Sequence, residues 1–465
     1  MWIRNRIVWP LNRDGIITRR IVPGRSAAGN SAVRCWPVRT VFSAESALAT
    51  LANDLPTALP NPPGIGPANL EVPDHIRRAR RAVFGVFVLN GFISANWIAR
   101  IPAIQDHIGL GEGGLGLALL GAAAGSLIAM PLAGWGVSKV GSKVLTIGTL
   151  TALAVTLPLL AVANSGWMLF LVLAVFGASF GSCDVTMNAQ AVEVEHGYGR
   201  PILVSFHAGF SFGGLGGALA GGLAATLDID PLPHFIAIGV LGLVALAFLA
   251  PPLLPFKPQT AVKSDEPQER LPLMRFIRRL PNRLLILGVF AFCCLIGEGA
   301  MADWTAVYLD DWLDTSSGLA AGGYAAFSLT MAVGRLFGDR LTAAWGPVAI
   351  LRRGGTMVAI GLGVALILGA PWAAIVGCAC VGAGLAATFP VVLSAAGKTP
   401  GLGVGPALAV ATTCGYFGFL VGPPLIGLTA EVVGLPTSLG IVAIMGVVIA
   451  ALAGAAREPE VERAP

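Results

Sequence analysis

Apolar runs of about 20 residues recur along most of the chain, separated by short polar breaks. A helix that crosses the hydrocarbon core of a bilayer needs about 20 mostly apolar residues. The pattern therefore predicts an all-α integral membrane protein with twelve transmembrane helices in two six-helix bundles. The first six spans are expected at 82–103, 115–137, 144–163, 167–190, 202–226 and 234–254. The second six are expected at 284–308, 319–341, 348–369, 372–394, 404–428 and 435–454.

Composition excludes the soluble alternatives. Of the 465 residues only 12% are charged and 55% are hydrophobic, whereas a soluble domain has about 25% charged residues. A soluble globular domain, a disordered chain, a disulfide scaffold and a secreted enzyme are all excluded. Six of the seven cysteines lie inside apolar runs without a histidine beside them. We therefore expect them to pack as small apolar side chains, with no metal and no cofactor.

The charges concentrate in three segments outside the spans. Residues 1–81 are rich in arginine and broken by proline and glycine, which predicts a disordered cytoplasmic tail. An alternative is that translation starts later, near Val72. Residues 255–283 are expected to form a cytoplasmic linker with a short interfacial helix at Leu273–Leu280, and 455–465 a second cytoplasmic tail.

The basic residues between spans set the orientation, because they accumulate on the cytoplasmic side of a membrane. Alternate breaks hold Lys139 and Lys143, the linker, and Arg352 with Arg353. The opposite loops hold acidic residues such as Asp228 and no lysine or arginine. We expect a multi-pass protein of the bacterial inner membrane with both termini in the cytoplasm.

Two features suggest that the halves arose by duplication. Gly85-Val86-Phe87 early in the first span matches Gly288-Val289-Phe290 early in the seventh, an offset of 203 residues. The turn after the second span, 134–143, has a counterpart at 334–340. Both segments resemble the G-x-x-x-D-R-x-G-R-R loop of the major facilitator superfamily, and with twelve spans the resemblance covers 82–454. It implies two pseudo-symmetric bundles. The expected gating-loop residues are Gly134, Ser138, Lys139, Gly141, Arg335, Asp339 and Arg340.

Within that superfamily the chain is similar to a bacterial branch of inner-membrane transporters, and more loosely to fucose–proton symporters. Segments 90–104, 184–193, 205–207 and 298–304 carry this likeness. The resemblance implies transport through a central cavity lined by spans 1, 4, 7 and 10. It also implies alternating access, in which the cavity opens to each side in turn.

Ionisable side chains inside the spans are the candidates for solute binding and proton coupling, because such groups are costly in hydrocarbon and are functional by default. Arg100 could instead extend to the headgroups, Asp184 could pair at the cytoplasmic neck, and His207 could be structural. The full candidate set adds neighbouring polar and aromatic residues: Asn90, Asn96, Trp97, Arg100, Asp184, Asn188, His207, Glu298, Asp303 and Trp304.

The 203-residue offset places Arg100 opposite Asp303 at one depth of the cavity. A cation and a carboxylate at such positions would spare each other an unpaired charge. We therefore expect an Arg100–Asp303 pair that closes the outer side, with Glu298 as the coupling carboxylate.

Glycine recurs at every fourth position of the fifth span, which predicts one helix face without side chains. Such a face allows close helix approach in membranes, and we expect it to pack at the moving seam between the bundles. Its residues are Gly209, Gly213, Gly217 and Gly221.

The favoured function is secondary active transport of a small solute, sugar-like or another polar metabolite, by a proton symporter that is not an enzyme. We expect a monomer in the lipid bilayer that binds its solute and protons and no nucleic acid. Two alternatives are proton-driven efflux of drug-like compounds and a membrane-embedded enzyme acting on lipids. The second would need clustered acidic and basic residues at one membrane face, but Asp310, Asp311 and Asp314 have no basic partners in their loop.

Reporter fusions test the predicted topology. Fusions after residues 265 and 398 should report the cytoplasm, and fusions after Asp228 and Asp314 the opposite side, because the basic breaks stay inside. Alkaline phosphatase and fluorescent-protein activities measure the two locations. An outside signal at 265 would contradict the twelve-span arrangement.

Overall fold

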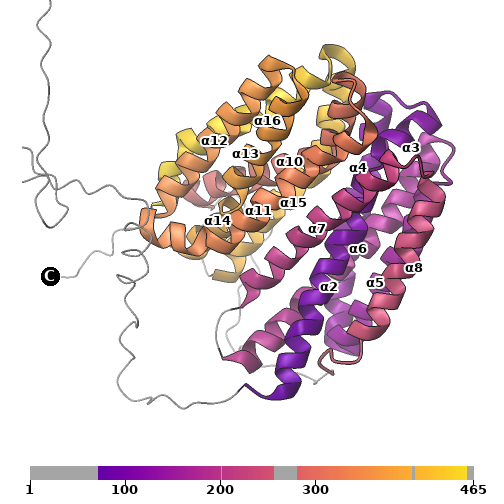
Figure 1. Cartoon of the computed structure of the whole chain (residues 1–465). Helices are drawn as coiled ribbons and strands as arrows, with labels where there is room; N and C mark the ends of the chain where they lie inside the picture. The colour runs from indigo at the N-terminus through magenta and orange to yellow at the C-terminus, as the bar shows by residue number, and fades with distance from the viewer. Residues whose placement is uncertain (1–71, 200–201, 256–279, 401–403, 458–465) are drawn as a thin grey trace, which may run out of the picture. The chain divides into compact units, whose positions relative to one another are not determined.

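The computed structural model describes residues 72–199, 202–255, 280–400 and 404–457, and every regular element in these ranges is a helix (Figure 1). The first bundle contains α2 (Asp74–Ile98), α3 (Ile101–Ile108), α4 (Glu112–Val140), α5 (Ser142–Leu160), α6 (Gly166–Tyr198), α7 (Leu203–Thr226) and α8 (Pro231–Leu249). The second contains α10 (Asn282–Val307), η1 (Tyr308–Trp312), α11 (Ser317–Trp345), α12 (Pro347–Leu368), α13 (Pro371–Leu385), α14 (Thr388–Gly397), α15 (Val404–Val433), α16 (Leu435–Leu452) and η2 (Ala453–Ala456).

The predicted all-helical membrane fold is confirmed. In the part of the chain that the structure describes, eleven helices or helix pairs are long and apolar enough to cross a membrane. The remaining predicted span corresponds to α11, which is 29 residues long but carries Arg335 and Arg340. These charged side chains lower the mean hydropathy of α11.

Two of the spans are broken, each four residues before a proline. Helix α2 ends at Ile98 and α3 follows with Pro102, while α13 leads through Ala386 to α14 with Pro390. Proline has no N–H to bond the carbonyl of the fourth preceding residue, and its ring clashes with that carbonyl. The same rule therefore explains both breaks.

The first span begins earlier than the sequence suggested. Helix α2 starts at Asp74, eight residues before the predicted boundary, and Ile76 and Ala79 are buried. Ile76 also lies against Gly197 of α6. Residues 74–81 therefore belong to the first helix rather than to a disordered tail. The rest of that predicted tail and the segment 273–279 of the expected interfacial helix lie outside the described residues.

Helices α4 and α11 give direct evidence of the internal duplication. Each has 29 residues, and each ends at a glycine with positive φ, 90° at Gly141 and 80° at Gly346. Residues with a side chain rarely adopt this backbone conformation, so glycine suits the position after both helices. The matching bounds define an offset of 205 residues in this part of the fold.

These helix ends correct the expected gating loops. Gly134, Ser138 and Lys139 lie inside α4, and only Gly141 lies in the turn. The expected gating residues of the second bundle all lie inside α11, namely Arg335, Asp339 and Arg340. This helix continues to Gly346, which has a positive φ.

The glycine face of α7 packs within the first bundle, not at the seam between bundles. A Cβ atom built on Gly213 would meet the carbonyl oxygen of Val88, and one on Gly217 would meet that of Phe92, both on α2. Gly209 and Gly221 likewise face α2, against Phe84 and Ala99. The expectation of a moving seam along this face was wrong, because α2 and α7 are neighbours in the same bundle.

A different face of α7 forms part of the seam. Gly214 lies near Ser328 of α11, and Gly222 lies against Gly318 and Ala321 at the start of that helix. The other seam joins α4 to α15. There a Cβ built on Gly116 would lie 2.7 Å from the carbonyl oxygen of Pro423. Small residues thus allow backbone contact at both seams.

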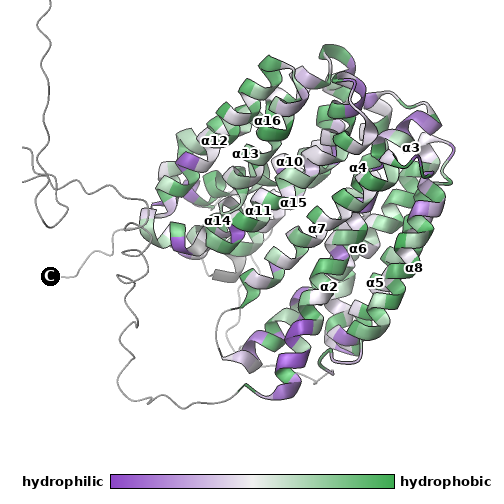
Figure 2. Cartoon of the chain, viewed as in Figure 1, coloured by the Kyte–Doolittle hydropathy of each residue, from purple (hydrophilic) through white to green (hydrophobic). Residues whose placement is uncertain are grey.

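Hydrophobic residues make up much of every helix (Figure 2), and many large apolar side chains are exposed. Ile128 is 69% exposed, Phe248 78% and Ile367 86%. In water such surfaces would associate, whereas in a bilayer they meet lipid tails. The helices are therefore arranged for a membrane.

The α2–α7 contact can be tested with two alanine substitutions on one helix. Gly213→Ala should lower the apparent melting temperature of the purified protein, with a cost of about 1–3 kcal/mol from overpacking against a backbone carbonyl. Gly216→Ala is the matched control, because its Cβ would lie 3.6 Å from the Phe92 ring, an ordinary contact. Equal melting temperatures for the two variants would contradict the packing described here.

Candidate functional site

A cavity of about 380 Å³ lies between the two bundles. Helices α2, α4, α6 and α7 line it from the first bundle, and α10, α11, α14 and α15 from the second. Spans 1, 4, 7 and 10 line the cavity as expected, through α2, α6, α10 and α14. Spans 2, 5, 8 and 11 also contribute to its walls.

At the loop side of α4 and α10, direct contacts join the two bundles. The indole N–H of Trp312 donates to a carboxylate oxygen of Glu112 at 3.2 Å, which joins the end of the seventh span to the start of α4. Glu431 of α15 lies against Gly113. Nearby, Thr226 at the end of α7 lies against Gly318. These contacts occupy the loop side that the topology prediction places outside.

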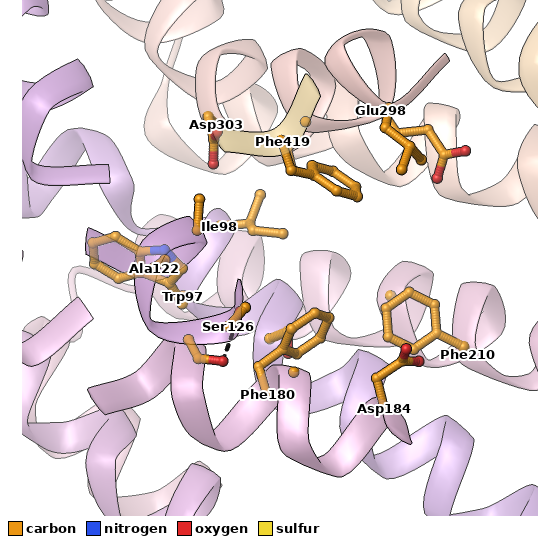
Figure 3. A pocket seen from close by; sticks show the side chains of 18 of the residues that line it. Trp97, Ile98, Ala122, Ser126, Phe180, Asp184, Phe210, Glu298, Asp303 and Phe419 are labelled. Carbon is orange, nitrogen blue, oxygen red and sulfur yellow. Dashed lines mark hydrogen bonds between the residues drawn. The ribbon is translucent and has the colours of Figure 1, made fainter. Parts of the chain in front are cut away.

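Five of the candidate residues line the cavity. Figure 3 shows Trp97 and Asp184 on the first-bundle wall, and Glu298 and Asp303 on the wall formed by the second bundle. His207 of α7 is the fifth. The cavity thus gathers three carboxylates and one imidazole between the bundles.

Arg335 is a cavity-lining residue that the sequence analysis placed in a gating loop. Its Nη2 atom donates to Oε2 of Glu298 at 3.2 Å, and the two side chains are only 20% and 17% exposed. Its Nη1 atom donates to the hydroxyl of Ser211 on α7 at 3.1 Å. The signal was present, because Arg335 lies inside the predicted span 319–341 rather than at its end. A guanidinium at that depth requires a carboxylate partner.

Asp184 is held by its own helix. The side-chain amide of Asn188 donates to the Asp184 carbonyl at 2.8 Å and to its carboxylate at 3.1 Å. Asn188 therefore positions the Asp184 side chain, but Asn188 itself is not among the lining residues.

Other candidates point away from the cavity into the packing between helices. Asn90 donates to the sulfur of Met187, and Asn96 bonds His234 at 2.9 Å. Trp304 is fully buried beside Gly427. None of these three lines the cavity in the described structure. The rotation of each helix about its axis decides which residues face the cavity and which face another helix. The sequence alone did not define this rotation.

The expected Arg100–Asp303 pair is absent from the ion pairs of the described residues. Arg100 lies in the break between α2 and α3, and its Nη2 atom donates to the carbonyl of Ile229 at 2.8 Å. The break turns this side chain toward the α7–α8 loop. Asp303 consequently forms no ion pair within the described ranges.

Aromatic and methionine side chains form a large part of the remaining wall, where asparagines were expected. Phe180, Phe210 and Phe419 are visible around the space in Figure 3. Tyr324 and Tyr416 also line it, together with Phe176, Phe327, Phe389, Met130, Met187 and Met331. The arrangement can hold a small molecule between ring faces and a few charged groups.

A double-mutant cycle tests the buried ion pair. Glu298→Gln and Arg335→Gln should each lower the apparent melting temperature, because each leaves the other charge without its partner. The double variant should lose less stability than the sum of the two single losses, with a coupling free energy of about 0.5–3 kcal/mol. Arg340→Gln on the exposed end of α11 is the control and should change little. Additive effects would show that the pair does not couple.

The sequence of residues 82–404 matches the family model of the Major Facilitator Superfamily. An uncharacterised MFS-type transporter of Yersinia pestis is 36% identical over 371 residues, which cover 79% of this chain and 93% of that protein. Among solved structures, a mutant form of the nucleoside transporter NupG superposes with a TM-score of 0.65 at 15% identity, covering 81% of this chain and 99% of that one. An inward-facing, unoccupied bacterial homologue of the human lysosomal transporter Spinster gives 0.63 at 16%, covering 82% and 97%. The chain belongs to the major facilitator superfamily.

Proposed function

We propose that this protein is a secondary active transporter that moves a small polar solute by alternating access, coupled to protons. The observation that carries the proposal is the position of Arg335 inside the cavity. This side chain bonds Glu298 in its own bundle and Ser211 in the other. A change of charge on the glutamate would therefore be felt at a contact between the bundles.

This arrangement supports the proposal of proton coupling. When Glu298 takes up a proton, its attraction for Arg335 falls and the guanidinium needs another partner. Asp184 lies within electrostatic range of Arg335, on the first-bundle wall. The exchange of partners would change the forces between the bundles, which is how proton binding would favour one orientation of the cavity over the other.

The contacts that join the bundles at one loop side support a direction of opening. With the predicted topology, the contacts of Trp312 with Glu112 and of Gly222 with Gly318 lie on the outer side. The described conformation is then closed to the outside. Both termini lie in the cytoplasm in this assignment, and the membrane is the bacterial inner membrane.

Efflux of drug-like compounds is the second candidate. Six phenylalanines and three methionines line the cavity, and such adaptable apolar walls suit varied amphiphilic molecules. The two functions differ in the direction of net movement. Accumulation inside everted vesicles on addition of a proton gradient would favour efflux.

Neutralising the coupling carboxylate tests the proposed function. Glu298→Gln should abolish accumulation driven by a pH gradient, because a permanently neutral side chain imitates the protonated state. Exchange of labelled for unlabelled solute should persist, since it needs no net proton movement. Both are measured in proteoliposomes across a panel of small metabolites.

The control is Asp106→Asn, which removes one negative charge from an exposed position on α3. It should leave both activities intact. Gradient-driven accumulation by Glu298→Gln at wild-type rates would place proton coupling elsewhere.

A further inference from the structure

The charges that line the cavity do not balance. Three carboxylates face one guanidinium and one imidazole. Glu298 pairs with Arg335, and Asp184 accepts a hydrogen bond from Asn188. Asp303 has neither an ion pair nor a hydrogen bond among the described residues, although it faces the cavity (Figure 3). A carboxylate in this setting needs a cation or a proton from outside the protein.

Asp303 is separated from the coupling pair. It lies five residues after Glu298 on α10, about 7.5 Å along the helix axis. Figure 3 shows the two carboxylates at opposite ends of the second-bundle wall, with Trp97 facing the end that holds Asp303. The cavity therefore has one end with an internal ion pair and one end with an unpaired carboxylate.

The surroundings of Asp303 suit an organic cation. Trp97 and Phe419 line the cavity with Asp303, and aromatic rings attract cations through their quadrupoles, tryptophan most strongly. Tyr324 lies within electrostatic range of Asp303. The hydroxyls of Ser94 and Ser328 also line the cavity and could bond polar groups of a solute.

We propose that the transported solute carries an ammonium group, which binds between the Asp303 carboxylate and the ring face of Trp97. At the other end, Glu298, which pairs with Arg335, then binds the coupled proton. This substrate class rests on the proposed transport function. It assigns separate tasks to two carboxylates of one helix, so that solute and proton do not compete for one group.

Other solute charges fit the walls less well. An anionic solute would meet an excess of carboxylates and would have to displace Glu298 to reach the guanidinium. A neutral solute would leave Asp303 uncompensated. Arg100 cannot serve as the internal cation in this conformation, because it is bonded to Ile229 in the helix break. The volume of about 380 Å³ limits the cation to a small molecule.

Cysteine labelling tests the preference for cations without knowledge of the solute. Ala302→Cys places a thiol beside Asp303 on the cavity wall. Two reagents of similar size are compared in detergent solution, with the parent protein as the blank. They are 2-aminoethyl methanethiosulfonate, a primary ammonium, and 2-sulfonatoethyl methanethiosulfonate, an anion. The labelling rate of the ammonium reagent is divided by that of the anionic reagent. This ratio should be at least about tenfold higher for the protein thiol than for free cysteine.

Two further variants identify the groups responsible. Asp303→Asn, in the Ala302→Cys background, should reduce that preference at least about tenfold, while Asp106→Asn should leave it unchanged. Trp97→Phe should keep most of the preference and Trp97→Leu should reduce it, because only the first retains a ring face. Circular dichroism and size-exclusion chromatography establish that each variant is folded. A preference that survives Asp303→Asn would overturn the proposal.

Transport provides the second readout. Proteoliposomes are tested with matched pairs that differ in one group, such as glucosamine against glucose and 2-aminoethanol against ethylene glycol. Preference for the amine member, lost in Asp303→Asn, supports the proposal, whereas preference for the neutral member overturns it. If no solute moves, the proposed transport function fails for this panel, and the labelling ratio alone decides whether the cavity selects cations.

Discussion

The ion pair between Arg335 and Glu298 is the interaction on which the cavity depends. A guanidinium deep in a membrane protein is costly unless a carboxylate compensates it. The pair lies on two helices of one bundle, so it fixes α11 against α10. Its remaining hydrogen bond, to Ser211, reaches the other bundle. The charge state of one glutamate is therefore linked to the contact between halves, which a neutral cavity could not achieve.

Backbone contact through glycine is the second constraint. Helix α7 packs against α2 on one side, where Gly213 meets the carbonyl of Val88, and against α11 on another, where Gly222 meets Gly318. The first contact is internal to a bundle and the second joins the bundles. One helix thus combines a neighbour within its own bundle with a neighbour across the seam, and glycine allows close backbone approach at both contacts.

The fold could be predicted because a membrane span is defined by length and hydropathy, which a single sequence displays directly. The sequence also identified Glu298, Asp303 and Asp184 as cavity candidates, because an ionisable side chain stands out inside an apolar span. The direction of each side chain was not predictable, because it depends on helix rotation. Asn96 therefore seemed a cavity residue yet bonds His234. Arg335 was assigned to a gating loop by the motif resemblance, although the predicted span 319–341 contains it. Helix α11 continues to Gly346, where the local backbone conformation ends it.

Helices α4 and α11 have the same length and the same terminal glycine, but the residues that they place on the cavity wall differ. At the 205-residue offset, Met130 of α4 is the counterpart of Arg335, and both line the cavity. One of the two equivalent positions thus holds an apolar side chain and the other a charge. Equivalent positions of the two bundles therefore present different chemistry to the cavity. The charge on one wall has no matching charge at the equivalent position of the other, so the two walls differ in the groups that they can bind.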